Sequence, residues 1–150
     1  MMKTRIVAAL MAVVALLAGV GASTALAAPP SAVEIDIIPT TGPPCFFQCG
    51  TWTATGAITD SGTYERVHGA TSPPDRPFGT TGPYREEFLL TSGLGTFTVD
   101  AEERAGPVGS EGVWQIHAGS GVYESASGHG TSSFIPPVLV LVLTGVASTD

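Results

Sequence analysis

The stretch Gly50-Thr-Trp-Thr-Ala-Thr-Gly-Ala-Ile58 has the alternation of a β-strand that is buried on one face. Apolar and small residues take the even-numbered positions and three threonines the odd ones, which is the two-residue period of a strand rich in β-forming residues. Thr59-Asp-Ser-Gly62 supplies turn-forming residues, and Thr63 to His68 is expected to return as the second strand of a hairpin. This region therefore predicts antiparallel β-structure.

Similar short runs, bounded by Gly, Pro, Asp and Ser, recur along the chain, and helical periodicity is almost absent after residue 27. The last run, Val138 to Ala147, consists of strand formers and is half the length of a membrane span, so we expect a strand buried on both faces. Closure into a barrel would remove its open edge. We predict an all-β fold, a single small antiparallel closed β-barrel of about eight strands. The other expected strands are Val33–Ile38, Arg85–Thr91, Gly95–Glu103, Gly112–His117 and Gly128–Ile135.

The first 27 residues have the pattern of a secretory signal peptide. A short basic region at Lys3 and Arg5 precedes an uncharged apolar run, and Ala25-Leu-Ala27 supplies the small residues of a cleavage site. The apolar run is shorter than the roughly 20 residues that cross a bilayer, so a cleaved signal is favoured over a retained anchor. We predict cleavage between Ala27 and Ala28, secretion by the general route, and a mature chain without a membrane span.

The mature chain has the length of one domain. Residues 28–49 form an N-terminal strand and a disulfide loop, part of the barrel or leading into it, and residues 50–150 form the barrel domain. Cys45 and Cys49 are the only cysteines, and in an oxidising compartment we expect them to form a disulfide. A redox-active pair is the alternative, but the spacing is not the Cys-x-x-Cys of thioredoxin-like sites.

The charge of the mature chain disfavours polyanionic partners. After loss of the signal, four arginines and no lysine remain against 13 acidic residues, a formal charge of −9. Such a surface repels nucleic acid and anionic membranes.

Several motifs resemble the small exported bacterial proteins that are assigned an allene oxide cyclase barrel-like fold. They are Gly50-Thr-Trp-Thr-Ala-Thr-Gly56, Gly93-Leu-Gly-Thr-Phe-Thr98, Trp114-Gln-Ile-His-Ala-Gly-Ser-Gly-Val-Tyr-Glu-Ser-Ala-Ser-Gly-His-Gly130 and Leu143-Thr-Gly-Val146. The resemblance covers roughly Gly50 to Val146 and implies a β-barrel. It implies little about activity, since one fold supports many functions. The segment Glu124-Ser-Ala-Ser127 departs from the relatives, so no role of a basic residue there is carried over.

Five side chains are predicted to line a ligand cavity: Trp52, Tyr64, Glu87, Trp114 and Tyr123. Aromatic residues at alternating positions are more often plain core, which is the alternative for the four aromatic residues. Glu86-Glu87 and Glu102-Glu103 are adjacent pairs whose members point to opposite faces, so neither pair forms a dyad, but one member of each is able to point inward. A single buried glutamate would have a raised pKa and could act as a general acid or base.

No catalytic triad, nucleotide loop or cofactor motif is present in the sequence. His68, His117 and His129 lack zinc-motif spacing, so we predict no metal site, with a composite site that includes Glu65, Glu87 or Glu124 as the alternative. We expect a secreted barrel without catalytic activity that binds a small apolar ligand in or at the mouth of the barrel. The alternatives are an isomerase or cyclase for a hydrophobic substrate, and an interaction protein that uses the loop Gly69–Pro83. The sequence does not indicate the oligomeric state.

Overall fold

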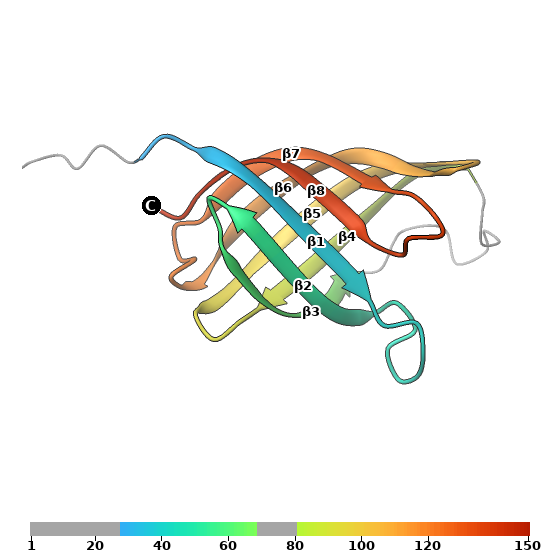
Figure 1. The fold of residues 1–150 in the computed structure, drawn as a ribbon, viewed down its shortest axis with the longest axis horizontal. Coiled ribbons are helices and arrows are strands. Elements are labelled where there is room, and N and C mark those ends of the chain that lie inside the picture. The colour runs from blue at the N-terminus through green and yellow to red at the C-terminus, as the bar shows by residue number, and fades with distance from the viewer. Residues whose placement is uncertain (1–27, 69–80) are drawn as a thin grey trace, which may run out of the picture.

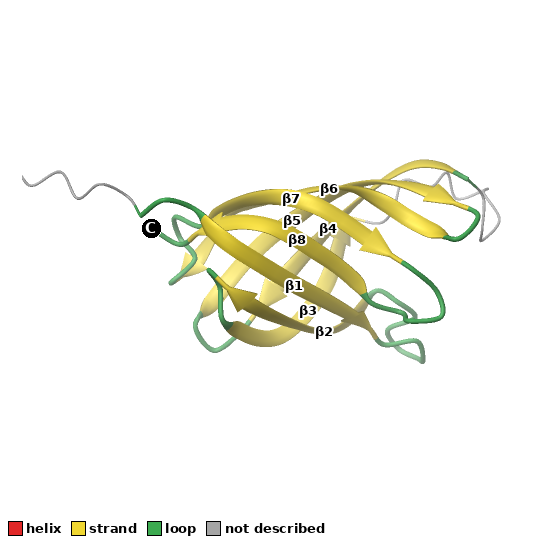
Figure 2. Cartoon of the chain, turned by 45° about the horizontal axis from the view of Figure 1, so that its top comes forward, coloured by secondary structure: helices red, strands yellow, loops and turns green. Residues whose placement is uncertain are grey.

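Eight β-strands form where the alternating runs lie, as a computed structural model that describes residues 28–68 and 81–150 shows (Figure 1). Within these residues the chain contains strands and turns but no helix (Figure 2), and so no helix long and apolar enough to cross a membrane. The strands are β1 (Ser31–Pro39), β2 (Cys49–Gly56), β3 (Asp60–His68), β4 (Gly82–Thr91), β5 (Gly95–Gly106), β6 (Gly109–Gly121), β7 (Ser127–Phe134) and β8 (Leu141–Ser148).

The strands form one closed antiparallel barrel in which each strand pairs with the next along the chain. β1 pairs with both β2 and β8 and thereby closes the ring, with Ile35 opposite Ala54 on one side and Leu143 on the other. The predicted all-β closed barrel of about eight strands is confirmed. Closure satisfies every sheet edge, because no strand is left with an unpaired side.

The last strand corrects one prediction. β8 begins at Leu141 rather than Val138, and it is not buried on both faces, because Leu141, Leu143 and Ala147 are buried while Thr144 is exposed. Pro136 and Pro137, which have no N–H to donate, precede the strand. A single-walled barrel covers only the inner face of each strand, so β8 alternates like the others.

The interior is packed mainly by side chains from β1 to β6 and from β8, while Phe134 of β7 packs against them. Its largest fully buried members include Trp52, Phe88 and Phe97. Trp52 and Phe97 make an edge-to-face contact with ring centroids 5.3 Å apart. Each tryptophan pairs with a glycine of the next strand, Trp52 with Gly62 and Trp114 with Gly130. The indole N–H reaches past this glycine to a carbonyl of the strand beyond, that of Thr91 for Trp52 and that of Thr144 for Trp114, both at 3.2 Å.

Two predicted segments fall outside the described residues. The signal peptide covers residues 1–27, and the described chain starts at Ala28, next to the predicted cleavage site. Most of the predicted loop Gly69–Pro83 is likewise outside, and its last two residues, Gly82 and Pro83, already belong to β4.

Candidate functional site

Two glutamates point into the barrel at one end. In β4, Glu86 is in phase with the buried Phe88 and Leu90, and in β5, Glu103 is in phase with the buried Val99 and Ala101. Alternate residues of a strand face the same side, so both carboxyl groups belong to the inner face. Glu103 is 3% exposed and Glu86 is 8% exposed. The barrel thus carries two buried acids on neighbouring strands.

An arginine accompanies the first of these acids. The guanidinium of Arg66, from β3, lies 2.9 Å from the carboxylate of Glu86, and both side chains are largely buried. Burial raises the pKa of Glu86 to about 7, against the opposing effect of Arg66 and with a further contribution from the charge of Glu103. At neutral pH Glu86 is therefore able both to accept and to donate a proton.

Two hydroxyl groups hold the second acid. Tyr84 and Ser110 both donate hydrogen bonds to the same oxygen, Oε2, of Glu103, and the two hydroxyls lie 2.7 Å apart. Burial raises the pKa of Tyr84, and its hydrogen bond to Glu103 raises it further, because ionising this phenol would place a second negative charge beside the carboxylate. Tyr84 is therefore a hydrogen-bond donor throughout the physiological pH range.

Three buried polar atoms at this end have no hydrogen-bond partner: Arg66 Nε, Glu103 Oε1 and Ser132 Oγ. Ser132 is 3% exposed. Gly112 of β6 pairs with Glu103 of β5 on one side and with Ser132 of β7 on the other, so Glu103 and Ser132 lie at the same level of the barrel wall. Buried polar groups without partners are costly and rare, so such a group calls for an explanation in terms of a ligand, water or ion. We call the six residues that face this part of the interior the polar cluster: Arg66, Tyr84, Glu86, Glu103, Ser110 and Ser132.

Strand positions place the polar cluster at the barrel end that carries the β1–β2, β5–β6 and β7–β8 connections. Arg66, Glu103 and Ser132 lie shortly before the ends of their strands, whereas Tyr84 and Ser110 lie just after the starts of theirs. Antiparallel pairing brings all these strand ends to one side of the barrel (Figure 1). In β3 to β6, apolar residues lie deeper in along the same face, so the polar cluster lies between the apolar interior and this end of the barrel.

The four aromatic residues predicted to line a cavity all point into the barrel, but only Tyr64 lies near the polar cluster. Trp52 and Trp114 are fully packed and use their N–H groups on strand carbonyls. The hydroxyl of Tyr123 donates to Asp60 at 2.5 Å, at the opposite end, where β3 begins. These three residues serve the core.

Glu87 does not line the interior, and this prediction is wrong. It is out of phase with Phe88 and Leu90, so its side chain lies on the outer face, where it pairs with the exposed His68 at 3.6 Å. Its neighbour Glu86 takes the inward position. The phase of the β4 and β5 alternation, extended to each glutamate pair, was the signal in the sequence that identifies Glu86 and Glu103.

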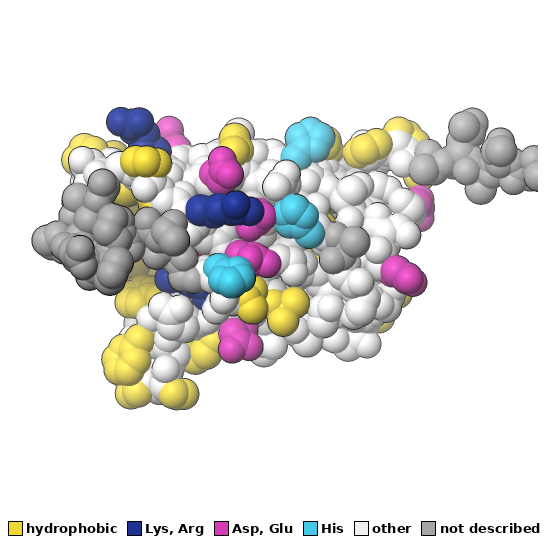
Figure 3. Space-filling model, turned by 180° about the vertical axis from the view of Figure 1, so that it is seen from behind, with side chains coloured by type: hydrophobic (Ala, Val, Ile, Leu, Met, Phe, Trp, Pro, Cys, Tyr) yellow, Lys and Arg dark blue, Asp and Glu magenta, His cyan; other side chains and the backbone are white. Residues whose placement is uncertain are grey.

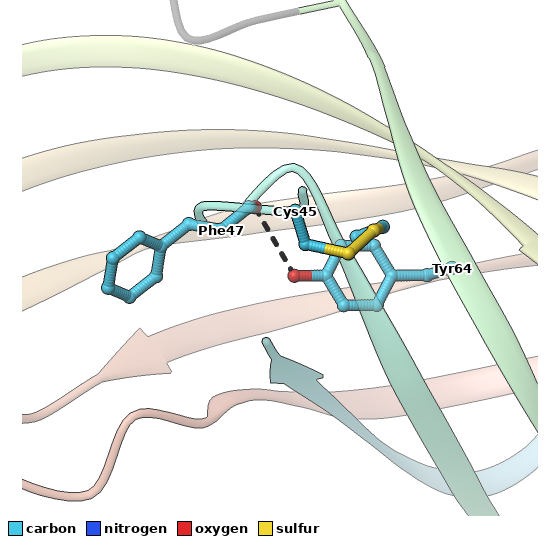
Figure 4. Close-up of a disulfide and its surroundings, with 4 residues drawn as sticks. Cys45, Phe47 and Tyr64 are labelled. Atoms are coloured by element: carbon cyan, nitrogen blue, oxygen red, sulfur yellow. Dashed lines mark hydrogen bonds between the residues drawn. A yellow bond between two sulfur atoms is a disulfide. The ribbon is translucent and has the colours of Figure 1, made fainter. Parts of the chain in front are cut away.

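The disulfide Cys45–Cys49 closes a short loop at the same barrel end, with Cα atoms 5.0 Å apart. The loop continues into β2, and the hydroxyl of Tyr64 donates to the carbonyl of Phe47 inside it at 3.4 Å (Figure 4). Burial raises the pKa of Tyr64 to about 12. The hydrogen bond from Tyr64 thus joins the disulfide loop to an inward side chain whose pKa is affected by the charges of Arg66 and Glu86.

The outer face of the barrel carries a second set of polar side chains. Histidine, acidic and arginine side chains gather in a band on the back of the barrel (Figure 3). In the strand register, His68, Glu87, Asp100, Gln115 and His129 form one continuous row across β3 to β7. Among the described residues, no three His, Cys, Asp or Glu side chains are arranged so that they could hold a metal ion.

Asp100 is the buried member of that outer row. Arg85 lies 2.6 Å from its carboxylate and His117 lies 2.8 Å from it. Burial acts to raise the pKa of Asp100, but the hydrogen bonds from Arg85 and His117 outweigh it and hold the pKa below its usual value. The ion pairs with Arg85 and His117 therefore stabilise the charged form of Asp100, although its side chain is buried on the outer face.

Two hollows, of about 510 and 470 Å³, lie on the barrel wall rather than in its centre. The first follows the outer faces of β4, β5 and β6 beside Arg85, Arg104 and Glu111, and reaches Tyr84 and Glu103 from the outside. The second lies beside the disulfide and reaches Tyr64. Each hollow thus touches residues of the polar end.

No family model, curated protein or solved structure matches the chain.

Proposed function

We propose that the protein is a secreted β-barrel that binds a small ligand at the mouth of the barrel, where the polar cluster lies. The observation that carries this proposal is that three buried atoms without hydrogen-bond partners, Arg66 Nε, Glu103 Oε1 and Ser132 Oγ, belong to residues near the same end of the barrel. A ligand that supplied their missing hydrogen bonds would offset the cost of burying them.

The unpartnered atoms define the polar end of this ligand. Glu103 Oε1 accepts, Arg66 Nε donates, and Ser132 Oγ does either, so a ligand that satisfies them needs both a hydrogen-bond donor and an acceptor. The buried side chains of Phe88 in β4 and Ala101 in β5 lie next in phase to Glu86 and Glu103 and favour an apolar remainder. The ligand that this proposal expects is therefore a small, mainly apolar molecule with one polar end.

An extracellular location is supported by the disulfide, which is the form that a cysteine pair takes in an oxidising compartment. The signal-peptide pattern of residues 1–27 supports the same location.

Native mass spectrometry of protein purified from culture medium tests ligand binding. We expect an adduct of a few hundred daltons that is lost on denaturation, a mass range typical of ligands for such sites. Glu103→Gln, which changes the inward carboxylate, should reduce the adduct at least tenfold. Glu102→Gln, its neighbour on the outer face, is the matched control and should retain it. The absence of any adduct, or equal loss in both variants, contradicts the proposal.

A second candidate is an isomerase or cyclase for a hydrophobic substrate, in line with the resemblance to the allene oxide cyclase barrel-like proteins. It is favoured by Glu86, an inward carboxyl group whose pKa of about 7 suits general acid–base catalysis. The test is incubation of an apolar extract of the culture with the protein, followed by chromatography and mass analysis. An isomerase produces a compound of unchanged mass and new retention time, and Glu86→Gln should abolish it while Glu87→Gln does not. Unchanged extracts contradict this candidate without affecting the ligand-binding proposal.

A further inference from the structure

Exposed apolar side chains gather on the loops at the same barrel end. Five of them lie on the β1–β2, β5–β6 and β7–β8 connections, and we call them the apolar rim: Phe46, Val108, Ile135, Val138 and Leu139. These three connections lie at the end of the barrel away from the C-terminus (Figure 1), and apolar side chains are visible on the protruding corner there (Figure 3). Val108 is 79% exposed and Val138 is 65% exposed.

The rim is free of charge. None of residues 40–48, 105–110 and 134–140 is acidic or basic, although the chain as a whole has a formal net charge of −7. Several exposed prolines lie beside the apolar side chains in all three connections. Exposed apolar side chains that gather at one end of a barrel, without charged residues in the same connections, point to a docking surface for a protein or a membrane.

We propose that the apolar rim docks onto the surface of a zwitterionic lipid bilayer. Its side chains project from three separate loops, and a fluid bilayer interface accepts such separate tips into the boundary between headgroups and acyl chains. The acidic barrel is repelled by anionic headgroups, which selects a bilayer without net charge.

A second copy of the chain fits the rim less well. A stable dimer buries about 800 Å² per partner and carries on the order of ten hydrogen bonds. Five partly exposed side chains on three loop tips supply less area than that, and the rim carries no charged side chain for pairing across an interface. The docking proposal does not depend on ligand binding at the polar cluster.

Sedimentation with phosphatidylcholine vesicles tests docking of the exported chain. We expect the protein to pellet with the vesicles, with a partition coefficient that changes less than twofold between low and high salt, because no charged group takes part. Replacing a third of the lipid by phosphatidylglycerol should weaken binding. Failure to pellet with phosphatidylcholine, or binding that needs the anionic lipid, overturns the proposal.

Paired variants locate the docking surface. The double variant Val108→Ser/Val138→Ser should lower the partition coefficient by about 100-fold, roughly tenfold for each apolar side chain removed. Leu94→Ser/Val122→Ser is the matched control at the opposite end, where the two residues are 53% and 51% exposed, and should change it less than twofold. Circular dichroism establishes that both variants are folded.

Two outcomes of the paired experiment contradict the proposal. Equal loss of binding in both double variants would show that general hydrophobicity, not the rim, drives binding. A dimer that light scattering detects in the wild type, and that only the rim variant dissociates, would assign the rim to a second copy of the chain.

Discussion

The guanidinium of Arg66 lies 2.9 Å from the carboxylate of Glu86 inside the barrel wall, yet the pKa of Glu86 is raised to about 7. Burial, the largest cause, outweighs the attraction of Arg66, and the nearby charge of Glu103 adds to it. Taking a carboxylate out of water costs more than one partner returns, which is common for ion pairs in the interior. The pair is therefore a place where the fold is sensitive to pH.

The stability of the barrel should fall between about pH 4.5 and 7 because of Glu86. The folded protein holds the proton up to about pH 7, whereas the unfolded chain releases it near 4.5. In this window the folded state binds more protons, so the free energy of unfolding decreases as pH rises. The contribution is fully present below pH 4.5 and is lost by about pH 7, with a size of about 3 kcal/mol at most.

Urea unfolding of Glu86→Gln across this window measures the effect. Relative to wild type, the variant should gain stability steadily from pH 4.5 to 7. Glu87→Gln, which alters the adjacent carboxyl group on the outer face, should not reproduce this pH-dependent difference. Parallel curves for wild type and Glu86→Gln would show that the inward carboxyl does not titrate in this range.

The tyrosines should resist ionisation as long as the barrel is folded. The chain has three, and burial is the first cause of a raised pKa for each, to about 12 for Tyr64 and Tyr123. Absorbance at 295 nm should show little tyrosinate at pH 10.5 in the folded protein, whereas in denaturant more than half of the phenols ionise because their ordinary pKa is about 10. Equal titration curves for the two states would contradict the buried positions.

Replacing Gly62 by alanine should destabilise the barrel strongly. A Cβ at this position would lie 1.9 Å from the carbonyl oxygen of Thr91 and 3.0 Å from Nε1 of Trp52, so the backbone of β3 or β4 would have to move. Overpacking of this kind costs about 3 kcal/mol. Gly93→Ala is the control, because a Cβ there has nothing within 4 Å, and it should change the unfolding free energy by less than about 0.5 kcal/mol. Thermal unfolding compares the two, and equal midpoints would refute the close approach.

Removing the disulfide should cost about 2 kcal/mol or less. The bond between Cys45 and Cys49 joins residues only four apart in sequence, and the entropy that a cross-link removes from the unfolded chain is small for a short loop. Denaturant unfolding of Cys45→Ser/Cys49→Ser measures the loss. Reductant should lower the stability of wild type by the same amount and leave the variant unchanged, and a loss under reductant in both proteins would exclude the disulfide as the cause.

Local pattern alone was enough to predict the strands and the closed barrel. The period of two is encoded residue by residue, so Trp52, Ala54, Phe97, Val99, Trp114 and Ile116 could be assigned to the buried face before any contact was known. The same phase, continued along β4 and β5, also points Glu86 and Glu103 inward and Glu87 outward.

Which residues meet inside the barrel was decided by the tertiary structure. Arg66, Glu103 and Ser132 come from three strands that are not consecutive, and only the register around the closed ring brings them to one end. The pKa of Glu86 depends on that enclosure, since nothing in its sequence neighbours removes it from water. The sequence by itself determined which side of each strand is buried, because alternation is local, whereas closure decided which buried groups share a site, because register is a relation between strands.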